Sequence, residues 1–401
     1  MNRLSAAVNR IQPSATLAMT QRVGELKRSG IDIIGLSAGE PDFDTPDFVK
    51  EAAIAAIRKG QTKYTDVGGT PELRAAVAAK FARDNSLTYT TDQVIVSVGG
   101  KHTLFNALCA TVDAGDEVII PAPYWVSYPD IVAYAGGTPV FIAAGAKQGY
   151  KITPAQLDAA ITPATRWLIL NSPSNPTGAA YSATELAALG EVLRRHPQVL
   201  ILTDDMYEHV WYADTPFATM AEVCPDLYER TLTVNGCSKA FAMTGWRIGF
   251  AGGPQWIVKA MAKLQSQSTS NPCSIAQAAA LAALNGPQDF LEERNTAFRE
   301  RRDTVVAMLN DAPGLDCPTP EGAFYVYPDA SGCIGKKTPA GAVIDSDSAL
   351  IDYFIESARV AAVPGSAFGL SPAFRISYAT SLDVLKDACR RIQLACAALK
   401  N

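Results

Sequence analysis

Short apolar runs alternate with helical patterns between residues 92 and 285. Seven runs rich in Val, Ile and Leu have the length of buried strands, and lie at 94–98, 117–120, 139–142, 167–170, 199–202, 231–234 and 248–252. Amphipathic helices are predicted between most of them, at 101–112, 125–135, 155–161 and 182–195. This alternation predicts an α/β fold, with a mostly parallel seven-stranded sheet flanked by helices. Such sheets bind ligands at the carboxyl ends of their strands.

The chain has a different pattern on either side of this region. Before it we expect a strand at 31–36, a loop at 39–46 that contains two prolines, and helices at 14–29, 46–59 and 70–85. After it we expect a long helix at 289–310, strands at 322–327 and 375–378, and a helix from 382. The predicted organisation is an N-terminal arm (1–45) that also contributes to the small domain, a large domain (46–285), and a small α+β domain (286–401).

Composition narrows the class of protein. Of the 401 residues, 48% are hydrophobic and 19% charged, which indicates a folded globular chain. The net charge is −5 and the basic residues do not cluster, so nucleic acid is not an expected partner. No apolar run approaches the ~18 residues of a membrane helix, and the first ten residues do not resemble a secretory signal. We therefore expect neither a membrane partner nor secretion.

Cysteine and histidine usage gives no support for a metal site. The eight cysteines form no C-x-x-C pair, and the three histidines are scattered. Buried cysteines that act as small apolar side chains account for most of this pattern. Eight thiols without an evident pairing scheme predict a reducing, cytoplasmic location.

Lys239 is the first candidate for chemistry. It lies in a loop (235–250) between two predicted strands, among small residues. A lysine in such surroundings loses its proton more easily than a solvated one, and an imine-forming lysine needs that property. From the loop alone, an ordinary surface lysine is the favoured interpretation.

The wider sequence changes that interpretation. The segment Ser-Lys-Ala-Phe-Ala-Met-Thr-Gly-Trp-Arg-Ile-Gly (238–249) closely resembles the lysine motif of class I aminotransferases, which are fold-type I pyridoxal-phosphate (PLP) enzymes. Seven further segments resemble the family in the same order, at 37–43, 63–69, 99–101, 124–128, 171–178, 203–207 and 374–378. They span nearly the whole chain, and the bacterial aspartate aminotransferase subgroup is the most similar. The resemblance implies pyridoxal 5'-phosphate as the cofactor.

The resemblance also assigns roles around the cofactor ring. Lys239 corresponds to the lysine that holds the cofactor as a Schiff base and later moves a proton. Asp204 corresponds to the carboxylate that binds the pyridine nitrogen. Asp205 competes for that role, but the family has this aspartate three residues before a tyrosine, which here is Tyr207. Tyr207 and Asn175 correspond to the pair that hydrogen-bonds the ring oxygen, although a turn before Pro176 would also explain the asparagine.

Three further residues correspond to positions that contact the ring or the substrate. Arg375 resembles the arginine that grips the substrate α-carboxylate through two parallel bonds; the alternative is a strand arginine in a surface ion pair. Trp125 resembles the aromatic residue that stacks on the ring, and could otherwise be a half-buried aromatic. Gly39 lies where the family's backbone approaches the substrate, which glycine permits.

The phosphate would be held by several groups. Gly99 and Gly100 precede a predicted helix, so backbone N–H groups and the helix dipole face an anion there. Arg247 resembles the phosphate arginine of the family, and Lys101 is a further phosphate candidate. Tyr64 resembles the tyrosine that reaches the phosphate from the neighbouring subunit, which implies a homodimer with shared active sites.

The sequence departs from the family pattern in three places. Many relatives have a serine three residues before the lysine, where this chain has Gly236. The arginine that some members use for the distal carboxylate of aspartate is not identifiable, but Ser14 and Lys101 match positions associated with that carboxylate. Members active on prephenate tend to have a lysine where this chain has Gln12, which argues against prephenate.

These features together predict an enzyme, a reversible ping-pong aminotransferase. The expected substrates are L-aspartate and 2-oxoglutarate, and the products oxaloacetate and L-glutamate. An aminotransferase for aromatic, prephenate/arogenate or small neutral amino acids is the closest alternative. A PLP-dependent β-eliminating lyase and a non-catalytic PLP-binding module are more distant ones, and no basic helix-turn-helix precedes residue 40 to favour the latter.

Overall fold

The computed structural model describes residues 4–401, and its largest feature is a seven-stranded sheet with the order β2-β8-β7-β6-β5-β3-β4. The strands are β2 (Val94–Ser97), β3 (Glu117–Ala122), β4 (Thr138–Ala143), β5 (Thr165–Asn171), β6 (Leu200–Asp204), β7 (Thr231–Gly236) and β8 (Gly249–Gly252). All neighbouring pairs are parallel except those that involve β8. All seven predicted strands and the mostly parallel arrangement are confirmed.

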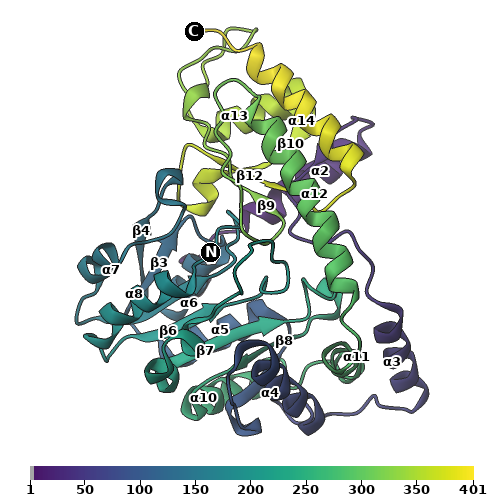
Figure 1. The fold of residues 1–401 in the computed structure, drawn as a ribbon, viewed down its shortest axis with the longest axis vertical. Coiled ribbons are helices and arrows are strands. Elements are labelled where there is room, and N and C mark those ends of the chain that lie inside the picture. Colours follow the sequence, from purple (N-terminus) through teal and green to yellow (C-terminus); the bar gives the residue numbers. More distant parts are fainter. Residues whose placement is uncertain (1–3) are drawn as a thin grey trace.

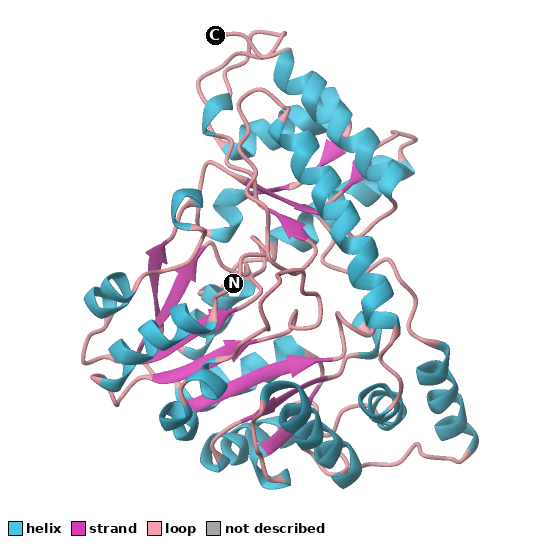
Figure 2. Ribbon diagram, viewed as in Figure 1, coloured by secondary structure: helices cyan, strands magenta, loops and turns pink. Residues whose placement is uncertain are grey.

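Helices cover the sheet in three packed groups. The first contains α5 (Gly100–Thr111), α6 (Ser127–Ala135) and α10 (Gln255–Ser266). The second contains α7 (Pro154–Ala160), α8 (Ala183–Arg194) and α9 (Met220–Val223). The third contains α3 (Asp47–Arg58), α4 (Pro71–Asn85) and α11 (Ser274–Asn285), packed near β2 and β8. In Figure 2 the magenta strands of the sheet lie in the lower half of the molecule, with cyan helices around them.

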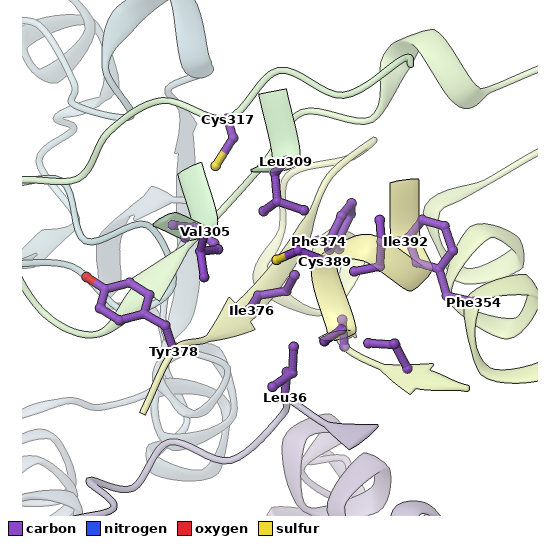
Figure 3. Close-up of a cluster of buried hydrophobic side chains, with 14 of the residues drawn as sticks. Leu36, Val305, Leu309, Cys317, Phe354, Phe374, Ile376, Tyr378, Cys389 and Ile392 are labelled. Carbon is purple, nitrogen blue, oxygen red and sulfur yellow. The ribbon is translucent and has the colours of Figure 1, made fainter. Parts of the chain in front are cut away.

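The N-terminal arm and the C-terminal region share a second core. It involves α2 (Ala15–Arg28), α12 (Phe290–Asn310), α13 (Asp347–Tyr353) and α14 (Leu382–Ala397). Figure 3 shows that Leu36, from the N-terminal part of the chain, points into the same cluster as Ile376, Cys389 and Ile392. Burial of this shared apolar surface holds the arm against the C-terminal part. The boundaries at residues 45 and 285 stay predictions.

The strands of this second region are short. β1 (Ile34–Gly35) pairs in parallel with β10 (Val360–Ala361), and β12 (Phe374–Ser377) lies between β11 (Val363–Pro364) and β9 (Tyr325–Val326). In Figure 1, α12 (green) runs from beside α11 up to α14, so it passes from one part of the molecule to the other. Among the helices of residues 4–401, none combines the length and apolar character that crossing a membrane requires. All eight cysteines are free thiols.

Candidate active site

A cavity of about 360 Å³ lies where the sheet meets the smaller region. All the predicted site residues except Tyr64 and Gly99 line it, namely Ser14, Gly39, Gly100, Lys101, Trp125, Asn175, Asp204, Tyr207, Lys239, Arg247 and Arg375. Several of them follow the carboxyl ends of β2, β3, β5, β6 and β7, and Arg247 comes just before the antiparallel β8. Because these ends meet at one edge of the sheet, segments far apart in the sequence converge there.

Lys239 lies in the loop after β7, and its Nζ donates a hydrogen bond of 2.5 Å to the carbonyl oxygen of Gly39. Burial is the main cause that lowers the pKa of this amine to about 8, and the positive charges of Arg375 and Arg247 act in the same direction. At pH 7 roughly a tenth of the amine is therefore uncharged, far more than of a solvated lysine, and this is the form that attacks a carbonyl.

Asp204 ends β6 and is only 6% exposed. It accepts a 2.7 Å hydrogen bond from the hydroxyl of Tyr128 and a 3.4 Å bond from the backbone N–H of Met206. Burial raises the pKa of its carboxyl to about 6. Asp205 does not line the cavity; it is buried, and one of its oxygens has no partner among the described residues.

Arg375 comes from β12 and is 1% exposed. Its Nη1 donates to the side-chain oxygen of Asn175 at 2.8 Å, and its Nη2 donates to the carbonyl oxygen of Ser37 at 2.5 Å. Its Nε has no partner among the described residues. The guanidinium lies 4.6 Å from the ring centroid of Tyr325, whose hydroxyl is 2.8 Å from that of Tyr207. Arg375 lines the cavity, and a guanidinium held in this way can pair with an anionic ligand.

The opposite end of the cavity is built for an anion. Gly99 has φ 86° and ψ 160°, a conformation essentially restricted to glycine, and α5 begins at Gly100. A Cβ at Gly99 would overlap the guanidinium of Arg247, and one at Gly249 would overlap the backbone of Gly100. The N-terminus of α5 and Arg247 therefore lie side by side. Lys101 follows directly, with its Nζ 5.0 Å from the ring centroid of Trp125.

The departure at position 236 has a packing reason. A Cβ at Gly236 would lie 3.0 Å from the carbonyl oxygen of Ile248 and 3.1 Å from the Cα of Gly249. A serine there would press against β8. Ser238, two residues later, lines the cavity.

The two predicted residues outside the cavity differ. Gly99 adjoins it through the contact with Arg247. Tyr64 is 91% exposed and makes no part of the cavity of this chain. Gln12, which bears on prephenate, does not line the cavity either; its backbone N–H donates to Asp130 at 3.0 Å.

Several lining residues were not predicted from the sequence. Tyr128 contacts Asp204, and Tyr325 contacts Tyr207. Further lining residues include Thr16, Leu17, Thr20, Asn171, Met206 and Thr244. Tyr128 stands three residues after Trp125, so helical spacing would have brought the two rings together; their centroids are 5.3 Å apart. Tyr325 had no such local signal.

A buried charged cluster lies behind the cavity, directly after Tyr207. Glu208 forms an ion pair with Lys80 of α4, which is 2% exposed, and accepts a 2.9 Å hydrogen bond from Asn85. His209 lies 3.0 Å from Glu208 and 3.4 Å from Asp84. Burial opposes the charge on Glu208, but the neighbouring Lys80 and His209 outweigh it and hold the pKa of this carboxyl far below its usual range.

The sequence of this chain matches a known protein family. The sequence signature described as aminotransferase class I and II matches residues 31–392. The chain is 62% identical to an aspartate/prephenate aminotransferase from Cereibacter sphaeroides, with 99% of each chain covered. It is 57% identical to an aspartate aminotransferase from Rhizobium meliloti, with 98% of this chain and 96% of that protein covered.

Solved structures give the same answer. The crystal structure of the aspartate aminotransferase from Rhizobium meliloti superposes with a TM-score of 0.97 at 56% identity, and each chain is covered completely. That of the Thermus thermophilus aspartate aminotransferase with maleate superposes with a TM-score of 0.92 at 44% identity, covering 98% of this chain and 100% of that one. On its sequence and its fold, this chain belongs to the class I and II aminotransferases.

Proposed function

We propose that this protein is a PLP-dependent aminotransferase that moves the amino group reversibly between L-aspartate and 2-oxoglutarate, giving oxaloacetate and L-glutamate. One observation carries the proposal: an amine with a lowered pKa, a carboxyl with a raised pKa and a buried arginine line one cavity. The names of the relatives from Cereibacter sphaeroides and Rhizobium meliloti support the choice of substrate.

The residues of the cavity fit the cofactor. Asp204 is a buried carboxyl without a cationic hydrogen-bond partner, which suits a protonated pyridine nitrogen. Arg247 and the N-terminus of α5 suit a phosphate, and Trp125 would stack on the ring. Asn175 and Tyr207 would hydrogen-bond the ring oxygen. When bound, the cofactor supplies an electron sink next to the substrate Cα.

Lys239 would then carry the acid–base chemistry. In the resting enzyme its amine would hold the cofactor. After the substrate has displaced this amine, it would take a proton from the substrate Cα and deliver it to the cofactor atom that is bonded to the substrate nitrogen. A pKa of about 8 suits both directions of proton transfer near neutral pH. The carbonyl oxygen of Gly39 gives this amine a fixed direction within the cavity.

Substrate selection would depend on carboxylate binding at two points. The guanidinium of Arg375 would hold the α-carboxylate. Lys101 and Ser14 both line the cavity and would receive the distal carboxylate of aspartate. Prephenate is a second candidate substrate, because the relative from Cereibacter sphaeroides is named for both compounds. Gln12, in place of the lysine that members active on prephenate tend to have, argues against it.

We further propose a cytoplasmic homodimer. Tyr64 is 91% exposed and would reach the phosphate site of a neighbouring subunit, near Arg247. A second, open hollow of about 690 Å³ lies beside Arg247 and provides room for a partner segment.

A half-reaction titration tests the function. L-Aspartate, L-phenylalanine and L-alanine are added separately to the purified holoenzyme, and the visible absorbance of the lysine-bound cofactor is followed. We expect rapid loss of this absorbance with aspartate and a slow response to the other two. A faster response to phenylalanine or alanine would overturn the substrate assignment, and no response to any of them would favour the lyase or binding-module alternatives. Pyruvate release from a cysteine conjugate identifies the lyase.

The distal-carboxylate assignment has a test of its own. Replacing Lys101 by Ala and Ser14 by Ala is expected to raise KM for aspartate and leave KM for alanine nearly unchanged. A preference for dicarboxylates that survives both changes would contradict it. Assay with prephenate and L-glutamate decides the second substrate.

A further inference from the structure

The backbone segment 37–45 touches the cavity at two points along its length. The carbonyl oxygen of Ser37 accepts from Arg375, and that of Gly39 accepts from Nζ of Lys239 at 2.5 Å. At its far end, the hydroxyl of Thr45 donates to the carbonyl oxygen of Ala242 at 2.7 Å. The segment therefore links the proposed carboxylate arginine to the loop that carries the lysine.

Arg294 joins the same two segments from outside the cavity. It lies on α12, and its Nη1 donates to the carbonyl oxygen of Ala240, the residue after Lys239, at 3.0 Å. Its Nη2 donates to the carbonyl oxygen of Asp44 at 2.6 Å. One guanidinium thus bridges the lysine loop and the 37–45 segment, at a residue that does not line the cavity.

Two aromatic rings fix the direction of this guanidinium. Its Cζ lies 5.1 Å from the ring centroid of Phe43 and 4.7 Å from that of Phe290. Stacking of this kind suits the planar guanidinium and is not reproduced by an ammonium group. A second arginine on α12, Arg301, pairs with Asp42 at 2.7 Å and supports the same segment.

The adjoining residue of α12 contacts a third segment, the loop after β6, which also carries the cavity residue Tyr207. Nδ2 of Asn295 donates to the carbonyl oxygen of His209 at 2.9 Å, two residues after Tyr207. The first turns of α12 therefore contact the 37–45 segment, the lysine loop and the loop that follows Asp204. α12 continues from there into the core of the smaller region.

The bond between Lys239 and Gly39 cannot persist through a reaction cycle. Whenever Nζ bonds to another group or carries a proton elsewhere, the direct tie between the two segments is absent. The bridge through Arg294 does not involve Nζ and does not depend on its state. We infer that Arg294 is a positioning residue, which keeps the Gly39 backbone and the lysine loop in register while Nζ is in use. This inference rests on the proposed transamination.

Three variants test it: Arg294→Met, Arg294→Lys and, as a matched control, Arg299→Met. Arg299 lies on the same helix and is exposed. Each holoenzyme is examined by amide hydrogen exchange, by steady-state kinetics with aspartate, and by the pH dependence of the visible absorbance of the bound cofactor. The absorbance titration reports the surroundings of the Lys239 nitrogen, which a loss of general stability would not move.

We expect Arg294→Met to raise exchange selectively in segments 40–46 and 240–246, and to lower kcat roughly tenfold or more with a smaller change in KM. The absorbance titration should shift. Arg294→Lys keeps the charge but cannot donate to both carbonyl oxygens in the same geometry. It should show the same exchange pattern as Arg294→Met, and its kcat should be closer to that of Arg294→Met than to that of the wild type. Arg299→Met should match wild type in every measurement.

Two results would overturn the inference. One is an Arg294→Lys enzyme equal to wild type, which would mean that only the charge matters. The other is an Arg294→Met enzyme, or its Lys substitute if the Met variant does not fold, whose exchange and absorbance titration match those of Arg299→Met. Failure of the proposed function would look different: the wild type itself would not transaminate, whereas the exchange result would still report on the bridge.

Discussion

Replacing Asp204 by Asn is expected to stabilise the cofactor-free protein near neutral pH and to damage the enzyme. The carboxyl of Asp204 is buried, and its two hydrogen-bond donors, Tyr128 and Met206, do not offset the loss of water. An amide has nearly the same shape and no charge to desolvate. It can keep the short bond from Tyr128 and lose only the 3.4 Å bond from Met206.

The magnitude follows from the pKa of Asp204, which rises from 3.8 to about 6 because of burial. The unfolded chain releases this proton near pH 4 and the folded chain near pH 6, so the folded state binds more protons in between. The free energy of unfolding of the wild type therefore falls as pH rises through that window, and the full penalty is present above it. The total is about 3 kcal/mol, of which roughly 2 kcal/mol develops between pH 4 and pH 7.

Urea unfolding of the cofactor-free wild type and of cofactor-free Asp204→Asn, each at pH 4 and at pH 7, measures this pH-dependent difference in the free energy of unfolding. The stability of Asp204→Asn relative to wild type should increase by about 2 kcal/mol from the lower to the higher pH. Using the difference between two pH values removes the effect of the lost bond from Met206, which does not titrate. If the relative stability is the same at both pH values, burial does not raise this pKa, and the assignment of Asp204 as the partner of a cationic ring loses its physical basis. With cofactor bound, kcat of the variant should fall by on the order of a hundredfold.

Three other substitutions test separate parts of the site. Lys239→Ala should abolish the absorbance band of the lysine-bound cofactor and lower turnover of aspartate by at least about a thousandfold; measurable turnover close to wild type would contradict its role. Gly99→Ala forces a side chain into φ 86° and against Arg247, at a cost of about 1–3 kcal/mol, so cofactor titration should give a Kd raised tenfold or more. Lys80→Met removes the lysine that pairs with the buried Glu208, so urea unfolding should lose about 3–5 kcal/mol, and adding Glu208→Gln should recover most of it; no recovery would mean that packing matters more than charge.

The large sheet was predictable because its signal is local. Strands buried on both faces appear as continuous apolar runs, as in Val-Leu-Ile-Leu (199–202), which runs into β6. The helix α11 was not predicted because its Ala-rich sequence has no polar stripe; it packs between α3 and α4 and is buried along most of its length. The strand predicted at 31–36 shrinks to Ile34–Gly35, since its length is set by the two-residue partner β10.

The cavity residues that lie in a sequence motif were predictable. Those that reach the site only through a contact with a residue far away in the sequence were not. Lys239, Asp204 and Arg375 lie in segments that resemble the family, and the fold brings these segments to one sheet edge. Tyr325 reaches Tyr207 across 118 residues of chain, and Arg294 reaches Asp44 across 250. Neither contact produces a regular spacing that could be recognised in the sequence. Both depend on how α12 and β9 pack against the large sheet.

Burial acts on the two central groups in opposite senses, and this links the site to stability. It lowers the pKa of Lys239 to about 8 and raises that of Asp204 to about 6, because in both cases it disfavours the charged form. The cofactor-free protein therefore holds an amine and a carboxyl that are both less stable than they would be in water. A ligand that takes the amine into a covalent bond and offers the carboxyl a cation removes both penalties at once. In the proposed enzyme, the same desolvation that prepares the reactive groups would therefore contribute to the affinity for the cofactor, and would give the folded holoenzyme a stability that the cofactor-free chain lacks.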